Sequence, residues 1–207
     1  MFKREIGEIY RLKVPFEEVY TSVFLIKRKG GNILVDCATS KWDVDTCVLP
    51  ALKAEGISAS EIKYLVLTHS HCDHAGGRDR IVELNPRIEI INEEGKSFQD
   101  SYTLSLTGHT LDSVGVLDLN TNTLIAGDGL QGYGIGKYGC TFEGIDEYEC
   151  TVKGLKNDKR IENLLLSHAF SPWERDCIFG RKSVLKYLDD CLNYVKEKKQ
   201  NESNYHK

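Results

Sequence analysis

The segment His69-Ser70-His71-Cys72-Asp73-His74 places four potential metal ligands within six residues. A short apolar run, Ile62 to Leu67, precedes it and predicts a strand buried on both faces. On a helix, His69 and His71 would point to nearly opposite sides. At the frayed end of a strand, alternate side chains share a side and can bind one ion. The stretch therefore predicts a strand that ends in a metal-binding loop.

The second half of this segment leads into a predicted helix over Gly77 to Leu84. Asp73 and His74 lie at the turn into that helix, where they are free to face a second ion. Gly76 and Gly77 allow the backbone to bend tightly there.

Four further segments repeat one pattern, an apolar strand that ends in an acid or an imidazole. They are Leu34-Val35-Asp36, Leu106-Thr107-Gly108-His109, Ile125-Ala126-Gly127-Asp128 and Leu165-Leu166-Ser167-His168. Strand ends that deliver such groups to one edge are how a layered sheet builds a site. Imidazole and carboxylate together suit Zn²⁺ and similar divalent ions, and two ions close together can activate water. Of the six histidines only His206 stands apart.

These motifs resemble the metallo-β-lactamase superfamily. The resemblance rests on His-x-His-x-Asp-His at 69–74, Gly-His-Thr at 108–110, Gly-Asp at 127–128 and Ser-His at 167–168, in the family's order. It implies an α/β (α+β) fold, a four-layer αββα sandwich of two mixed β-sheets flanked by helices. It also implies a cofactor of two divalent metal ions, zinc with iron and manganese as alternatives.

The same resemblance implies a role for each ligand. His69, His71 and His109 would bind the first metal, and Asp73, His74 and His168 the second. Asp128 would bridge the two ions, and Asp36 would orient the site from behind. Asp73 and Asp128 are the residues expected to take part in catalysis.

The rest of the pattern predicts one layered domain over 1–207 with an unstructured tail from about 198 to 207. Strands are predicted at Ile6–Leu12, Thr21–Lys27, Ile33–Asp36, Ile62–Leu67, Arg87–Ile91, Thr103–Thr107, Val114–Leu119, Thr121–Ala126 and Ile161–Leu166. Further helices are predicted at Asp43–Glu55, where Pro50 interrupts the pattern, and at Ser183–Glu197.

Composition narrows the class of protein. A formal net charge of -4 gives no general attraction to nucleic acid or to anionic membranes. There is no long apolar run and no recognisable signal peptide, so we expect a cytoplasmic protein. The seven cysteines are irregularly spaced without a C-x-x-C motif, which favours reduced thiols over a disulfide framework. Cys72, inside the motif, has no ligand role in the family pattern.

Two loops carry the candidate substrate contacts. Tyr133, Lys137 and Tyr138 follow Asp128, while Phe170 and Trp173 follow His168. The glycine patterns at 127–132 and 134–139 open no recognisable helix and are read as loop rather than as a nucleotide fingerprint. The stretch between Ile91 and Thr103 is short compared with relatives, so the pocket is either open or completed by a second copy in a homodimer.

The leading hypothesis is a zinc-dependent hydrolase of a small ester, thioester or lactone, similar to the glyoxalase II and lactonase branches. The alternative is a mononuclear iron persulfide dioxygenase on the same fold. A phosphodiesterase, a β-lactamase proper and a non-catalytic binding protein are weaker candidates. The sequence leaves the substrate, the natural metal and the oligomeric state open.

Overall fold

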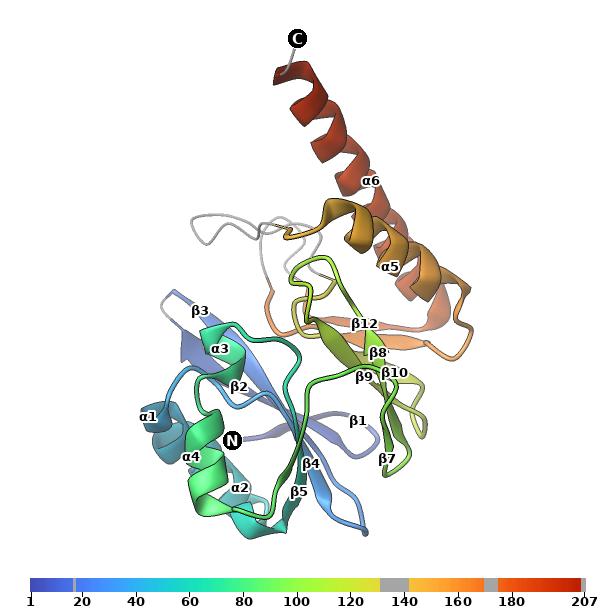
Figure 1. Cartoon of the computed structure of the whole chain (residues 1–207). Helices are drawn as coiled ribbons and strands as arrows, with labels where there is room; N and C mark the ends of the chain where they lie inside the picture. The colour runs from blue at the N-terminus through green and yellow to red at the C-terminus, as the bar shows by residue number, and fades with distance from the viewer. Residues whose placement is uncertain (17, 131–141, 170–174, 206–207) are drawn as a thin grey trace.

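The computed structural model describes residues 1–16, 18–130, 142–169 and 175–205. Two six-stranded sheets pack face to face, and helices cover the outer face of each (Figure 1). Both sheets contain parallel and antiparallel pairs. The expected αββα sandwich of two mixed sheets is confirmed.

The first sheet has the strand order β1-β2-β3-β4-β5-β6. Pairing is antiparallel from β1 to β4 and parallel from β4 to β6. The strands are β1 (Lys3–Ile6), β2 (Ile9–Phe16), β3 (Val19–Ile26), β4 (Asn32–Val35), β5 (Ile62–Val66) and β6 (Glu89–Ile91).

The second sheet has the order β12-β11-β10-β9-β8-β7. Only its β10–β11 pair is parallel among the pairs described. The strands are β7 (Ser97–Phe98), β8 (Ser101–Ser105), β9 (Val114–Asp118), β10 (Thr123–Ile125), β11 (Asn163–Leu165) and β12 (Cys177–Phe179).

The helical segments fall into two sets along the chain. The first set connects strands of the first sheet. It consists of α1 (Lys41–Asp43), the π-helix η1 (Val44–Val48), α2 (Leu49–Ala54), the 3₁₀-helix η2 (Ala59–Glu61), α3 (Cys72–Ala75) and α4 (Arg78–Leu84). The second sheet is covered by α5 (Ile145–Asn157) and α6 (Arg181–Tyr205). The C-terminal turns of α6 extend beyond the rest of the fold in Figure 1. No helix in the described part of the chain is both long and apolar enough to cross a membrane.

Alternation along the strands sorts the core into three layers. On β3, Phe24 and Ile26 face the other sheet, whereas Val23 and Leu25 face the helices. Side chains alternate between the two faces of a strand, so a strand buried on both faces must be apolar throughout. This explains why the sequence pattern there is continuous rather than alternating.

Pro50 shapes the first helical region, as its position in the sequence predicts. The segment is helical from Lys41 to Ala54, but it widens into the π-helix η1, in which the Leu49 N–H donates to the Val44 carbonyl. Proline cannot donate the i→i−4 bond of a regular helix, and a π-bulge accommodates that loss.

The sequence pattern did not predict several elements, β1 and β7 among them, and it misjudged the C-terminal tail. Neither α5 nor the short strand β12 was predicted. The tail from about 198 is helical as far as Tyr205 instead of unstructured. The physical reason is that Lys199 pairs with Asp146 and lies 2.6 Å from Glu149 Oε2, both on α5, so tertiary contacts support these polar turns.

Candidate metal centre

Strand ends, together with α3, which carries Asp73 and His74, bring the candidate ligands to one edge of the sandwich. Asp36 follows β4 and His69 lies beyond the end of the parallel neighbour β5. Asp128 and His168 follow β10 and β11, which are also parallel neighbours. His109 lies beyond the end of β8. The carboxyl ends of parallel strands meet at the same edge, so segments far apart in sequence converge there.

Two glycines make this convergence sterically feasible. A Cβ on Gly76 would overlap the carbonyl oxygen of Thr39, so α3 can pack against the loop after β4 only without a side chain. Gly127 has φ +53°, and a Cβ there would lie 2.6 Å from Thr68 Oγ1. These glycines therefore set the positions of the neighbouring donors His74 and Asp128.

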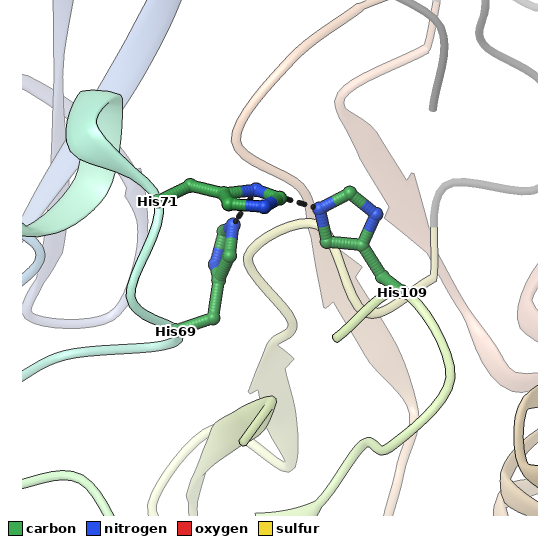
Figure 2. Close-up of side chains that lie close together, drawn as sticks. All are labelled: His69, His71 and His109. Carbon is green, nitrogen blue, oxygen red and sulfur yellow. Dashed lines mark hydrogen bonds between the residues drawn. The ribbon is translucent and has the colours of Figure 1, made fainter. Parts of the chain in front are cut away.

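The first donor group consists of His69, His71 and His109. His71 Nδ1 lies 3.0 Å from His69 Nε2 and 3.1 Å from His109 Nε2, so three ring nitrogens point at one another (Figure 2). Tetrahedral zinc with Zn–N distances of about 2.0–2.1 Å needs nitrogens roughly 3.3 Å apart. His71 is exposed, whereas His69 and His109 are buried, so the group opens to solvent on one side.

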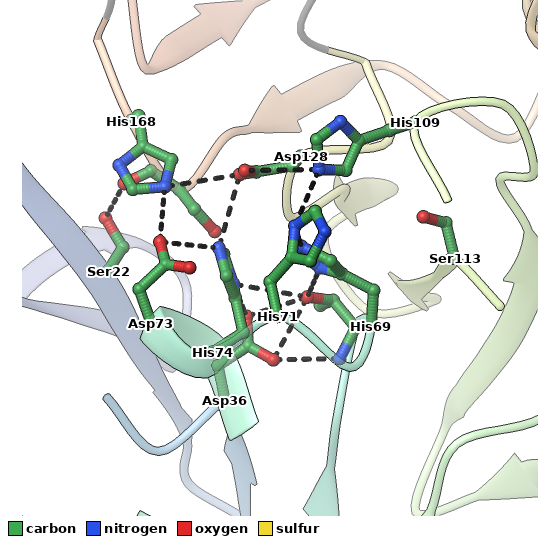
Figure 3. A network of polar contacts seen from close by, with 12 residues as sticks. Ser22, Asp36, His69, His71, Asp73, His74, His109, Ser113, Asp128 and His168 are labelled. Atoms are coloured by element: carbon green, nitrogen blue, oxygen red, sulfur yellow. Dashed lines mark hydrogen bonds and ion pairs between the residues drawn. The ribbon is translucent and has the colours of Figure 1, made fainter. Parts of the chain in front are cut away.

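The second donor group consists of Asp73, His74 and His168, all buried. Asp73 Oδ2 lies 3.2 Å from His74 Nε2 and 3.1 Å from His168 Nε2. Asp128 lies between the two groups. Its Oδ1 is 3.5 Å from His74 Nε2 and its Oδ2 is 3.8 Å from His109 Nε2 (Figure 3). One carboxylate oxygen thus faces each group.

Hydrogen bonds behind the donors fix the orientation of three imidazoles. Asp36 is fully buried and accepts the His74 Nδ1–H at 2.8 Å. Thr68 Oγ1 donates to Asp36 and lies 3.2 Å from His69 Nδ1, from which it can accept. His168 Nδ1–H donates to the Tyr20 carbonyl at 2.5 Å. Each bond leaves the Nε2 lone pair of that ring facing the site.

The pKa values of the histidines shift in opposite directions in the two groups. Burial lowers the pKa of His69 to about 2 and also lowers the pKa of His109, so both rings stay neutral. Burial alone would lower the pKa of His74, but the carboxylates of Asp128 and Asp36 raise it well above its ordinary value. Burial would raise the pKa of Asp73 too, yet its contacts with His168 and His74 hold it below the usual range.

The donor set fits divalent metal ions, and His74 gives the test. Its Nδ1–H is used by Asp36, and its Nε2 faces the carboxylates of Asp73 and Asp128, so this position favours positive charge, as the raised pKa of the ring also indicates. This buried nitrogen makes no hydrogen bond of acceptable geometry with any described residue. A metal ion held between this nitrogen and the carboxylates would supply that positive charge, and imidazole with carboxylate suits zinc, iron or manganese.

The structure gathers all seven predicted ligands, and Asp36, at one place. Sequence analysis missed Thr68, Tyr20 and Ser22, the last of which donates to the Ser167 carbonyl at 2.7 Å. Of these three residues, only Thr68 had a feature in the sequence that could have indicated its role, because it stands immediately before His69. The predicted substrate contacts Tyr133, Lys137, Tyr138, Phe170 and Trp173 lie outside the described residues.

A cavity of about 370 Å³ adjoins the first donor group. Its lining includes His69, the exposed Cys72, Arg78, Asn92 and Asp112. The wall combines one cation with one carboxylate over a partly apolar floor, which gives it no strong charge of either sign.

Comparison with known proteins gives a family match over part of the chain. The family model described as the metallo-beta-lactamase superfamily matches residues 17–98, which include Asp36 and the 69–74 motif. The chain is 34% identical over 82 residues to Recombination protein 2 of Haemophilus influenzae and 25% identical over 130 residues to Lactamase-like protein adaB of Aspergillus niger. These matches cover 38% and 55% of the chain but only 10% and 40% of the two relatives, so the chain spans less than half the length of either.

Solved structures extend the likeness to nearly the whole chain. A metallo-beta-lactamase of Cronobacter sakazakii, a HARLDQ motif mutant, has a TM-score of 0.72 at 13% identity, with 98% of each chain covered. BJP-1, a subclass B3 metallo-beta-lactamase of Bradyrhizobium japonicum, has a TM-score of 0.70 at 16% identity, covering 100% of this chain and 96% of its own. Residues 17–98 thus match the model of the metallo-beta-lactamase superfamily, and nearly the whole chain shares the fold of the solved metallo-beta-lactamases.

Proposed function

We propose that the protein is a metal-dependent hydrolase that uses two divalent ions, zinc in the first instance, against a small ester, thioester or lactone. The observation that carries the proposal is the convergence of two donor groups on either side of Asp128. Two bound ions would supply water of lowered pKa, near 7, and polarise the bond under attack.

Some residues of the site would hold the metal ions, and others orient the imidazole rings that bind them. The first donor group and the second donor group would each hold one ion, and Asp128 would reach both. Asp36, Thr68 and the Tyr20 carbonyl keep the rings turned toward the site. Asp73 has the most exposed carboxylate of the site, at 12%, and its lowered pKa keeps it ionised, so it can accept a hydrogen bond from the attacking water.

The described surroundings favour a small substrate of low charge. The 370 Å³ cavity balances Arg78 against Asp112, and the formal net charge of the chain is -4. A polyanion such as nucleic acid needs a cluster of unopposed cations to bind. Carboxylic esters, thioesters and lactones therefore rank above phosphodiesters as proposed substrates.

The first experiment is metal content per chain by elemental analysis, on protein purified without chelators or a metal-affinity tag. About two zinc ions per chain are expected. The loaded protein is then assayed with a p-nitrophenyl ester, a lactone, a thioester, a β-lactam and a bis-p-nitrophenyl phosphodiester. One iron per chain with oxygen uptake on a persulfide would replace the hydrolase by the dioxygenase alternative.

A further inference from the structure

A charged side chain occupies the apolar layer between the two sheets. On β2, Ile9 and Arg11 face the opposite sheet, whereas Leu12 and Val14 face the helices. The Arg11 side chain is only 1% exposed. A buried guanidinium costs stability unless it is paired and hydrogen-bonded, and an aliphatic residue at such a position is often more stabilising. The position of Arg11 therefore calls for a role other than packing.

Arg11 connects the first sheet to the segment just before β12. Its Nη1 lies 2.5 Å from Asp176 Oδ2, and its Nη2 donates to the Asp176 carbonyl at 2.8 Å. The same carboxylate oxygen accepts the Tyr20 hydroxyl at 2.6 Å and lies 2.6 Å from Lys13 Nζ. Glu5 adds a second carboxylate, 3.3 Å from Arg11 Nε. Three residues of the first sheet thus converge on one aspartate of the second.

This network meets the candidate metal centre at His168. The backbone carbonyl of Tyr20 accepts the His168 Nδ1–H, and its hydroxyl holds Asp176. The Asp176 carbonyl accepts the Leu166 N–H at 2.9 Å, two residues before His168. The segment that carries His168 is therefore attached to Asp176 on one side and to β3 on the other.

We propose that Arg11, Tyr20 and Asp176 form a positioning device that fixes His168 and so sets the affinity of the second donor group for its ion. The proposal rests on the proposed function, in that it takes the donor groups to bind metal. Among the described residues, the imidazoles of the first donor group contact one another and the side chains of Thr68, His74 and Asp128. Disturbing Asp176 should weaken the second ion and leave the first in place.

The experiment measures both metal dissociation constants in Tyr20→Phe and Asp176→Asn. Zinc is titrated into metal-free protein against a chromophoric chelator, and Co²⁺ spectra report which ligand set is filled. Loss of a hydrogen-bonding partner behind a ligand typically weakens metal binding about 10–100-fold. We expect that loss for the second ion in Asp176→Asn, a smaller loss in Tyr20→Phe, and a change of less than about twofold for the first ion.

A double variant, Arg11→Met with Asp176→Leu, separates positioning from stability. Apolar replacement of a buried ion pair commonly preserves or raises stability. We expect metal-free protein with an unchanged or higher Tm that still binds the second ion weakly. Asp45→Asn, which breaks another Arg–Asp pair between η1 and α4, is the matched control and should bind both ions normally.

The outcomes distinguish this proposal from the proposed function. Normal second-ion affinity in Asp176→Asn, or its recovery in the apolar double variant, would overturn the positioning role and leave a dinuclear hydrolase intact. Selective loss of the second ion in a protein that hydrolyses none of the substrates would support the positioning role while the hydrolase proposal fails. A wild-type chain that binds one ion would overturn both.

Discussion

The two donor groups differ in what holds them in place. The first donor group is three imidazoles that contact one another, and one of them, His71, is exposed. In the second donor group both imidazoles are buried and anchored through Nδ1, His74 by Asp36 and His168 by Tyr20. The second group is therefore ordered by the protein, whereas the position of His71 depends more on what binds there. Protein-ordered ligands lose less freedom on binding an ion.

Asp128 links the two donor groups because it faces a histidine of each. Its two oxygens face His74 and His109; burial would raise the pKa of its carboxyl, but the charges of His168 and His74 hold that pKa low. Asp128→Ala should remove metal from both groups, and hydrolysis should fall by a factor of about 10³ or more, since bound ions supply several kcal/mol. Elemental analysis and the ester assay check this. Asp158→Ala, which removes a partner of Arg160 at the surface, is the control. Full metal content and full rate in Asp128→Ala would rule out a bridging role.

Single histidine variants test whether the groups act separately. His71→Ala should lose the first ion and His168→Ala the second, so each should fall from about two bound ions to about one. Co²⁺ spectra should differ between the two variants, because the second donor group includes the carboxylate of Asp73 in addition to Asp128, whereas the first consists of three imidazoles beside Asp128. If either variant loses both ions together, the site is a single cooperative unit and the comparison between the groups fails.

The motif at 69–74 could be predicted because one strand and one turn position it. His69 to His74 are neighbours in sequence, so their geometry depends on local structure. The fold followed from the same reasoning, since apolar runs ending in acid or imidazole mark strands whose ends meet at one edge. The periodic strands were found, while β12, with only three residues, has too short a pattern to detect.

The residues behind the ligands could not be predicted in this way. Tyr20 acts through its backbone carbonyl, which any residue type would supply. Arg11 and Asp176 are 165 positions apart and meet only because the sheets pack face to face. Helix α5 buries only Tyr148, Val152 and Leu155, so its apolar pattern is sparse. Contacts that depend on tertiary packing leave no local signature.

Asp36→Asn sharpens the comparison by loosening one anchor of the second group. Asp36 has φ +61°, a conformation that asparagine also tolerates, so the backbone should persist. The neutral amide no longer strengthens His74 as a ligand, and we expect the second ion to bind about 10–100-fold more weakly. Asp100→Asn is a matched control, because Asp100 is exposed and has φ +60°. Equal losses of both ions in Asp36→Asn would show that Asp36 supports the whole site rather than His74.

Acid should weaken the support around His168. Burial would raise the pKa of Asp176, but hydrogen bonds from Lys13 and Tyr20 and the charge of Arg11 hold it below its usual range. A carboxyl whose pKa is lowered in the folded state stabilises the fold at pH values above its ordinary pKa of about 3.9. That stabilisation is lost as the pH falls below this value. The gap in unfolding free energy between metal-free wild type and Asp176→Asn should therefore narrow from pH ~6 to pH ~3. Urea unfolding at each pH measures it, and a constant gap would show that the charge of Asp176 adds no stability.

The smallest effect is expected at Cys72, although it lies between His71 and Asp73 in the motif. Its side chain is exposed toward the 370 Å³ cavity, and it belongs to none of the donor clusters found among the described residues. Cys72→Ser should change hydrolysis by less than about twofold, as is usual for surface substitutions away from structural features. Cys37 is the internal contrast, because burial raises the pKa of its thiol well above the ordinary value and its Sγ lies 3.2 Å from the His74 carbonyl. Alkylation of the native protein, mapped by mass spectrometry, should modify Cys72 and spare Cys37. A large loss of metal in Cys72→Ser would instead mean that the thiol binds an ion. One of the two donor groups would then include Cys72.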